Sequence, residues 1–248
     1  MINTFFNSLI KVVLALSLLI LVGCAGANVS TNAEPAKVAQ SPDPKPVDSK
    51  PTGAFANLPK LKGTATVEMK LKYGTVTIEV DGIDAPITAG NFVDLAKLGV
   101  YNGLIFHRVI REPSPFVAQG GDPLGNGTGS FIDPATSQPR LIPLEITKAY
   151  PPKEDFVPTP EYNKILKPED KAQLRHTRGA VAMARSQAPD SASSQFYITL
   201  ADVNFLDGSY AVFGYVTSGM DVVDQIKLGD RILSMTVTKG IENLQVSR

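Results

Sequence analysis

The chain has few of the side chains on which most enzyme chemistry depends. Its 248 residues include one cysteine, two histidines and no tryptophan. A single cysteine cannot form an internal disulfide, and two separated histidines with one cysteine do not make a zinc site. The sequence also lacks a Gly-x-Ser-x-Gly nucleophile elbow. These absences argue against a hydrolase or a metalloenzyme.

An excess of charge of one sign is also missing. The sequence has 24 basic and 24 acidic side chains and a formal net charge of zero, which gives no indication of nucleic-acid binding. Apolar residues make up 43% of the chain, enough for a sizeable core in one large or two small domains.

The N-terminal apolar run, residues 10–22, is short for a membrane-spanning helix and suits the core of a secretory signal. It ends in Leu21-Val22-Gly23-Cys24, which resembles a bacterial lipobox. We expect residues 1–23 to be a lipoprotein signal peptide and Cys24 to be the lipidated first residue. Its acyl chains would anchor the exported protein to a membrane facing a periplasm or a thylakoid lumen. The alternatives are an ordinary signal peptide or an uncleaved anchor.

Residues 24–62 are expected to form a flexible tether, because this stretch is rich in Pro, Ser and Lys and poor in apolar residues. The folded domain is expected over 63–248. Apolar and polar residues alternate on either side of Lys72-Tyr73-Gly74, which predicts a β-hairpin. Helices are expected from Asp84-Ala85-Pro86 to Gly99 and over 218–228. Further strands are predicted at 104–110, 116–119, 143–146, 180–184, 195–200, 211–216 and 232–238. This pattern favours a mainly β protein with a closed or nearly closed antiparallel barrel.

Four motifs set an arginine and glutamines among apolar residues, a combination that can hold and polarise a backbone group but is poorly suited to cutting it. They are Phe106-His107-Arg108, Phe116-Val117-Ala118-Gln119-Gly120-Gly121-Asp122, Met183-Ala184-Arg185 with Ser193-Ser194-Gln195-Phe196-Tyr197-Ile198, and Phe205-Leu206-Asp207-Gly208-Ser209-Tyr210-Ala211-Val212-Phe213-Gly214. In this order, over residues 67–246, they resemble the cyclophilin family of peptidyl-prolyl cis-trans isomerases. The resemblance implies a closed eight-stranded antiparallel β-barrel capped by two α-helices.

Within that family, four features look similar to members from cyanobacteria and the thylakoid lumen. They are Phe131-Ile132-Asp133-Pro134, Pro143-Leu144-Glu145-Ile146, Leu206-Asp207-Gly208 before Tyr210-Ala211-Val212-Phe213-Gly214-Tyr215-Val216, and Gly240-Ile241-Glu242-Asn243-Leu244. The resemblance implies proline-containing polypeptides as partners and requires no cofactor. We expect a monomer.

The resemblance also implies roles for individual residues. Arg108 would be catalytic, because a guanidinium directed at the prolyl nitrogen or the adjacent carbonyl stabilises the twisted imide more than either planar form. The substrate-binding residues would be Phe116, Val117, Gln119, Ala184, Arg185, Gln195, Tyr197, Phe205, Leu206 and Tyr210. The two glutamines would bind the substrate backbone, and most of the others would line the proline pocket. Ordinary core packing is the alternative interpretation of the pocket residues.

Several positions depart from the family pattern. Arg111-Glu112-Pro113-Ser114-Pro115 lengthens the connection between Arg108 and Phe116, and Arg185 stands where an asparagine is common. Phe205 replaces a tryptophan, which predicts weak inhibition by cyclosporin, and Tyr210 replaces a histidine. Residues 138–175 form a long Pro-rich insertion. These departures leave two alternatives open, an isomerase acting on exported or membrane-associated proteins and a weakly active or non-catalytic chaperone or assembly factor for a membrane-protein partner.

Overall fold

The computed structural model describes residues 55–151 and 158–246. The expected signal peptide, Cys24 and most of the expected tether lie outside the described residues. The folded part begins before the predicted boundary at residue 63. Strand β1 (Lys60–Leu61) pairs with β14 (Leu244–Gln245), and the side chain of Leu61 is fully buried.

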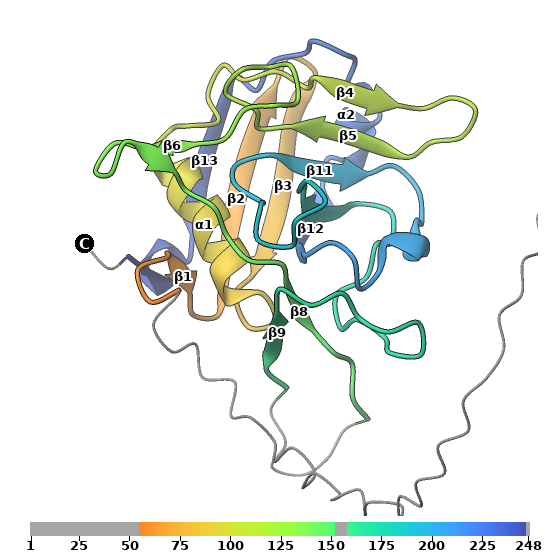
Figure 1. The fold of residues 1–248 in the computed structure, drawn as a ribbon. Coiled ribbons are helices and arrows are strands. Elements are labelled where there is room, and N and C mark those ends of the chain that lie inside the picture. The colour runs from red at the N-terminus through yellow and green to blue at the C-terminus, as the bar shows by residue number, and fades with distance from the viewer. Residues whose placement is uncertain (1–54, 152–157, 247–248) are drawn as a thin grey trace, which may run out of the picture. The chain divides into compact units, whose positions relative to one another are not determined.

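The centre of the fold is an antiparallel sheet of eight strands in the order β13-β2-β3-β12-β10-β11-β5-β4 (Figure 1). This confirms a mainly β fold. The strands of this sheet are β2 (Thr64–Leu71), β3 (Gly74–Asp81), β4 (Arg108–Ile110), β5 (Val117–Gly120), β10 (Ala180–Met183), β11 (Phe196–Thr199), β12 (Val212–Ser218) and β13 (Ser234–Lys239). Two small hairpins flank it: β6 (Ile132–Asp133) with β7 (Gln138–Pro139), and β8 (Glu145–Thr147) with β9 (Pro160–Tyr162).

The expectation of a closed barrel is wrong in one respect, because no ladder joins the edge strands β4 and β13 and the sheet stays an open half-barrel. Instead, the segments before these strands meet in a single bridge between Ile105 and Arg231. Gly103 and Gly229 turn with φ of 82° and 85° at the ends of this contact. Four backbone hydrogen bonds join residues 103–106 to residues 229–232. At the two glycines the positive φ turns the chain out of the extended conformation, so the pairing does not continue as a ladder.

Helix α1 (Pro86–Lys97) begins with proline in its first turn, as predicted. Every residue from Ile87 to Ala96 is buried, which exceeds the single stripe that the sequence indicated. The helix packs against β2, β3, β12 and β13, and β1 and β14 also contact it. The backbone of Lys60 comes so close that a Cβ on Gly90 would lie 2.5 Å from the Lys60 Cα.

The second helix is much shorter than the predicted 218–228. Helix α2 spans only Met220–Val223, and the chain then continues in tighter turns, with the amides of Gln225 and Ile226 bonded three residues back. Two short 3-10 helices, η1 (Asn204–Leu206) and η2 (Ile241–Asn243), complete the described structure.

Strand alternation divides the apolar side chains between two clusters on opposite faces of the sheet. On β11, Phe196 and Ile198 belong to the main core, whereas Tyr197 belongs to a second cluster on the outer face. On β12, Phe213 faces the main core and Val212 the outer cluster. The outer cluster is built on strands β5, β10, β11 and β12, so this face carries apolar side chains where solvent-facing polar residues would be usual.

Candidate active site

The outer face carries a row of directly paired residues across five neighbouring strands. Arg108 lies opposite Gln119, Gln119 opposite Tyr197, Tyr197 opposite Ala182, and Ala182 opposite Val212. Since side chains of directly paired residues point to the same face of a sheet, the register itself sets a cation, an amide and an aromatic ring side by side.

The polar end of this row is a chain of hydrogen bonds. Arg108 Nη1 donates to Gln119 Oε1 at 3.1 Å, and Gln119 Nε2 donates to Gln195 Oε1 at 3.1 Å. Gln195 Nε2 in turn donates to the carbonyl oxygen of Gly129 at 2.9 Å. Arg108 is exposed on β4, so its remaining guanidinium N–H groups can reach a bound molecule. The chain orients the cation without neutralising it.

The glycine-rich loop that accepts from Gln195 is shaped by the buried side chain of Asp122. Its carboxylate accepts hydrogen bonds from the amides of Leu124, Asn126 and Gly127. Burial raises the pKa of Asp122, but these three donors outweigh it and the pKa is lowered overall. An ionised Asp122 therefore fixes the loop at neutral pH.

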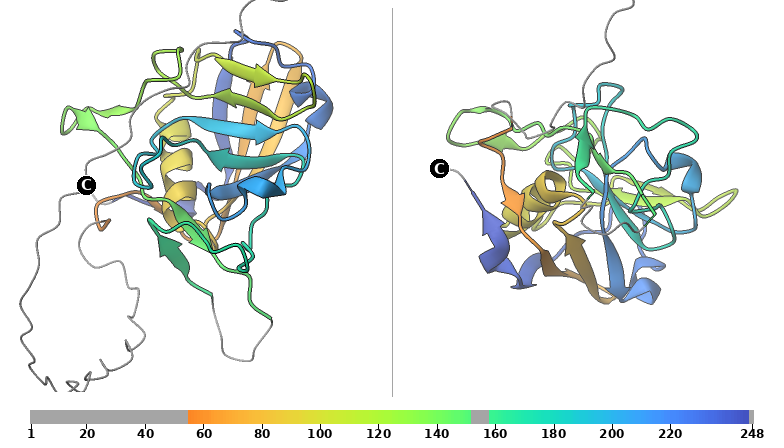
Figure 2. Two further views of the ribbon diagram at one scale, coloured as in Figure 1. Left: turned by 45° about the vertical axis from the view of Figure 1, so that its right-hand side comes forward. Right: turned by 90° about the horizontal axis from the view of Figure 1, so that it is seen from below.

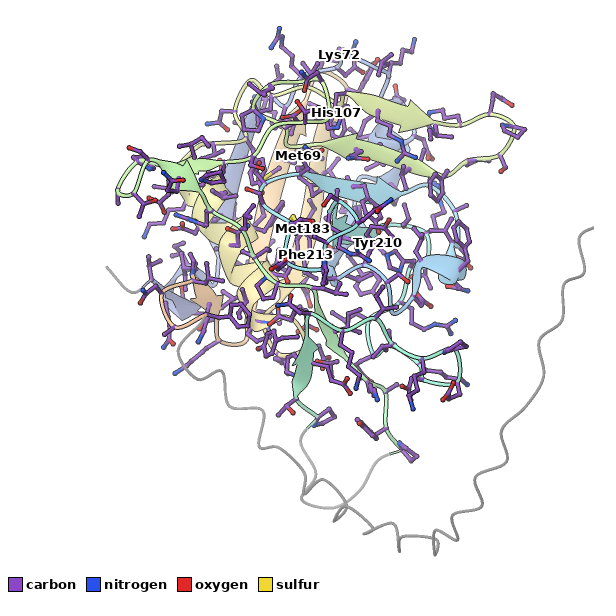
Figure 3. All side chains as sticks on the ribbon, viewed as in Figure 1. Met69, Lys72, His107, Met183, Tyr210 and Phe213 are labelled. Carbon is purple, nitrogen blue, oxygen red and sulfur yellow. The ribbon has the colours of Figure 1, made fainter. Side chains whose placement is uncertain are left out.

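The apolar end of the site consists of aromatic rings in contact. Phe116 stacks on Phe205 with ring centroids 5.9 Å apart, and the guanidinium of Arg108 lies 5.6 Å from the Phe116 ring centre. Tyr197 meets Tyr210 edge to face at 6.1 Å. Of the residues labelled in Figure 3, Tyr210 packs against this outer cluster, whereas Met183 and Phe213 belong to the main core. Val117, Ala184 and Leu206 belong to the same outer cluster.

The structure thus brings the predicted catalytic and substrate-binding residues together on one face of the sheet, while Cys24 lies outside the described residues. Phe205 is 74% exposed, and Tyr197 is buried beneath the surface. Arg185 brings a positive charge to the place where an asparagine is common. Its Nε and Nη2 donate to the carbonyl oxygen of Ser209, and the guanidinium lies 4.9 Å from the Tyr210 ring centre. Its side chain therefore closes one edge of the surface.

The lengthened connection after β4 leaves the register intact. Ile110 pairs with Val117, and the Phe116 amide donates to the Ile110 carbonyl at 3.0 Å, so the extra residues form the tip of the β4–β5 hairpin. Arg111 anchors this tip, because its Nη2 donates to the carbonyls of Val223 and Ile226 at 3.1 Å each.

Replacing Arg111 with alanine should lower the free energy of unfolding by about 1–2 kcal/mol, since two hydrogen bonds from a charged group are lost at a partly exposed site. Affinity for a proline peptide should fall by less than about threefold, because the strand register does not depend on this anchor. Urea unfolding and peptide titration measure the two effects. A fall in peptide affinity well above threefold would show that the loop itself binds substrate.

The insertion packs behind the site. The amide of Leu166 donates to the Gly208 carbonyl at 2.9 Å, and Leu166 joins a buried cluster with Leu144, Ile146 and Ala211. In Figure 1 and in the left view of Figure 2, the β8–β9 hairpin lies at the opposite end of the sheet from the β4–β5 hairpin. The described part of the insertion therefore supports the chain that carries Phe205 and Tyr210.

Sequence reasoning missed one group of residues behind the pocket. His176 is fully buried and is hydrogen-bonded to both Tyr197 and Asp207. The other histidine, His107, lies beside Gly127 of the loop, and burial lowers its pKa. Nothing in the local sequence pairs His176 with Tyr197, because they meet only through the fold.

Within residues 55–151 and 158–246, no helix is both long enough and apolar enough to cross a membrane. Over the same residues, no group of three or more His, Cys, Asp or Glu side chains could hold a metal ion.

Comparison with known proteins connects this geometry to a family. The family model described as cyclophilin type peptidyl-prolyl cis-trans isomerase matches residues 66–245. A Synechocystis protein named as a thylakoid lumen peptidyl-prolyl cis-trans isomerase is 45% identical over 198 residues, covering 77% of this chain and 51% of that protein. A chloroplastic peptidyl-prolyl cis-trans isomerase of Arabidopsis thaliana is 40% identical over 211 residues, covering 77% and 46%. The chain thus spans about half the length of these two relatives.

A peptidyl-prolyl cis-trans isomerase of Acinetobacter baylyi is 42% identical over 165 residues, covering 64% of this chain and 70% of that protein. Among solved structures, a cyclophilin-type isomerase of Cryptosporidium parvum superposes with a TM-score of 0.53 at 24% identity, covering 71% of this chain and 98% of that chain. Cyclophilin AquaCyp293 of Hirschia baltica gives 0.51 at 24%, covering 74% and 77%. At that level of sequence identity, the likeness to these two structures shows a shared fold and nothing more.

Proposed function

Because the chain belongs to the cyclophilin-type peptidyl-prolyl cis-trans isomerase family, we propose that it accelerates rotation about X–Pro bonds in exported or membrane-associated proteins. The observation that carries the proposal is the register that sets Arg108, Gln119 and Tyr197 side by side on one face. Proline-containing polypeptides are the partners, and no cofactor takes part.

The reaction requires stabilisation of a twisted bond, not cleavage. Peptide resonance sets a barrier of roughly 18–20 kcal/mol, and X–Pro bonds rotate unaided in about tens to hundreds of seconds. As the bond twists, the prolyl nitrogen regains a lone pair that the planar imide lacks. A guanidinium directed at this nitrogen or at the neighbouring carbonyl binds the twisted form better than either planar isomer, which lowers the barrier.

The residues divide this work between polar and apolar groups. Arg108 supplies the charge, and the Gln119 and Gln195 amides bind the substrate backbone beside it. Phe116, Val117, Leu206 and Tyr210 hold the proline ring, and Tyr197 forms the pocket floor. Phe205 and Ala184 border the pocket, and Arg185 closes its edge. A bound peptide would cover the exposed Arg108–Gln119 hydrogen bond and lower the dielectric constant around it.

An isomerisation assay with a short X–Pro peptide tests the proposal. The peptide is observed by exchange spectroscopy with catalytic amounts of protein, and the rate of cis-trans exchange should increase in proportion to the protein concentration. An unchanged rate at a protein concentration that binds the peptide would contradict catalysis.

A weakly active or non-catalytic chaperone or assembly factor is the second candidate. It is favoured by Arg185, whose guanidinium is occupied by Ser209, and by the supporting insertion. This candidate predicts suppression of aggregation of an unfolded client with equal, negligible isomerisation by wild type and Arg108→Ala.

The lipobox-like segment leads to a separate prediction about location. We propose that Cys24 is diacylated and N-acylated and that it anchors the folded domain to a membrane surface. In a bacterial host, Cys24→Ser should move the protein from the membrane fraction to the soluble exported fraction, and globomycin should cause the wild-type precursor to accumulate. An unchanged precursor size with globomycin would contradict lipidation.

A further inference from the structure

The side chain behind the proline pocket is a fully buried imidazole. His176 lies between β11 and the loop that follows η1, and none of its side chain is exposed. Its Nε2 is 2.9 Å from the hydroxyl of Tyr197 and its Nδ1 is 2.8 Å from Oδ1 of Asp207. The rings of His176 and Tyr197 lie almost parallel, 6.0 Å apart.

The direction of these hydrogen bonds follows from the protonation states. Burial lowers the pKa of His176, although Asp207 opposes this effect, so the imidazole is neutral at neutral pH. Burial raises the pKa of Tyr197, which therefore keeps its proton. The neutral ring then donates from Nδ1 to Asp207 and accepts at Nε2 from the Tyr197 hydroxyl.

The same network holds the opposite wall of the pocket. Asp207 follows Phe205 and Leu206 in the chain, and its carboxylate also accepts from the His176 amide at 2.7 Å and from Arg175 Nε at 3.1 Å. The Val203 amide donates to the His176 carbonyl at 2.8 Å. Backbone bonds thus hold this loop to residue 176, and the imidazole joins the loop to the ring of Tyr197.

We propose that His176 is a positioning residue for substrate binding, which sets the ring of Tyr197 and the Phe205–Leu206 loop at the spacing that a proline ring requires. The inference rests on the proposed function and names a residue that acts only through the pocket walls. Because the walls contact the proline ring in both the planar and the twisted state, loss of this network should weaken binding uniformly and raise KM more than it lowers kcat.

The test uses the full chain and three variants: His176→Phe, Tyr197→Phe and the double variant. Phenylalanine keeps a ring at each position and removes the hydrogen bond. We expect each single variant to weaken the Kd for a short Ala-Pro peptide by about 5- to 10-fold with kcat within about twofold. The double variant should bind the peptide no more weakly than the single variants. In each single variant either the Tyr197 hydroxyl or His176 Nε2 stays buried without its partner, whereas the double variant has neither group.

Ile78→Val is the control for a general loss of stability, because Ile78 is fully buried on β3 in the main core. It should lower the thermal midpoint without changing the Kd. Variants that bind like wild type, or a wild type that does not bind the peptide, would overturn the inference. If wild type binds but does not isomerise the peptide, the proposed function fails, and the Kd values still decide the role of His176.

Discussion

Replacing Arg108 with alanine should lower kcat/KM for X–Pro isomerisation by about 100- to 1,000-fold, the loss typical of removing one preorganised donor from a charge-stabilising site. The thermal midpoint should hardly change, because Arg108 is exposed and its protein hydrogen bond is to Gln119. Activity and folding are therefore separable at this position. The measurement is the exchange rate of an X–Pro peptide at several protein concentrations.

Two controls sharpen this prediction. Arg108→Lys keeps the positive charge but loses the planar fork, so it should recover only part of the activity. Arg178→Ala removes an arginine that pairs with Asp224 and donates to the Leu200 carbonyl. It takes no part in the hydrogen-bond chain of Arg108, Gln119 and Gln195 and should retain full activity. An Arg108→Ala protein as active as Arg178→Ala would rule out the arginine mechanism.

Replacing Glu145 with alanine should lower the free energy of unfolding by about 2–4 kcal/mol, the cost of leaving buried backbone donors without acceptors. Glu145 is 1% exposed, and its two carboxylate oxygens accept from the amides of Ile87 and Thr88 at 3.1 Å and 2.7 Å. These amides belong to the first turn of α1, where backbone N–H groups have no hydrogen-bond acceptor within the helix. One side chain thus ties the β8–β9 insertion to the main helix.

The pH dependence of Glu145 has a definite sign. Burial raises its pKa, and the amides of Thr88 and Ile87 offset this only in part. A carboxyl group whose pKa is higher in the folded state adds stability that is complete below its unfolded pKa of about 4.5 and is lost as the pH rises through the folded value. Wild type should therefore lose more stability than Glu145→Gln on going from about pH 4 to pH 7.

Urea unfolding over this pH range measures both effects, with Glu68→Ala, an exposed position on β2, as the control. Equal unfolding midpoints for Glu145→Ala and Glu68→Ala would show that the insertion is not held to α1 in this way. Comparing the peptide affinity of the Glu145 variants with that of wild type measures the contribution of the insertion to the pocket.

Secondary structure and site residues could be predicted from the sequence where they depend on short patterns of neighbouring residues. Period-two alternation on either side of Lys72-Tyr73-Gly74 correctly predicted the hairpin of β2 and β3, and the proline at the start of α1 correctly marked its first turn. The four motifs singled out residues that the structure collects on one face. Local patterns suffice for these features because each depends on neighbouring residues along the chain.

Features that depend on tertiary contacts could not be predicted. The failure of β4 and β13 to join follows from where two distant segments diverge, and the full burial of α1 follows from β1, which precedes the predicted domain boundary. The contact of His176 with Tyr197 is likewise set by the fold. Tertiary context decided each of these features, and residue propensity carried no signal for them.

The most direct test of the account is the structure of the protein with a bound Ala-Pro peptide, determined by crystallography or from intermolecular NOEs. The proline ring should lie against Phe116, Leu206 and Tyr210, with the Arg108 guanidinium within hydrogen-bonding distance of the prolyl nitrogen or the preceding carbonyl. A peptide bound on another surface, or an Arg108 side chain turned away from the imide, would contradict it.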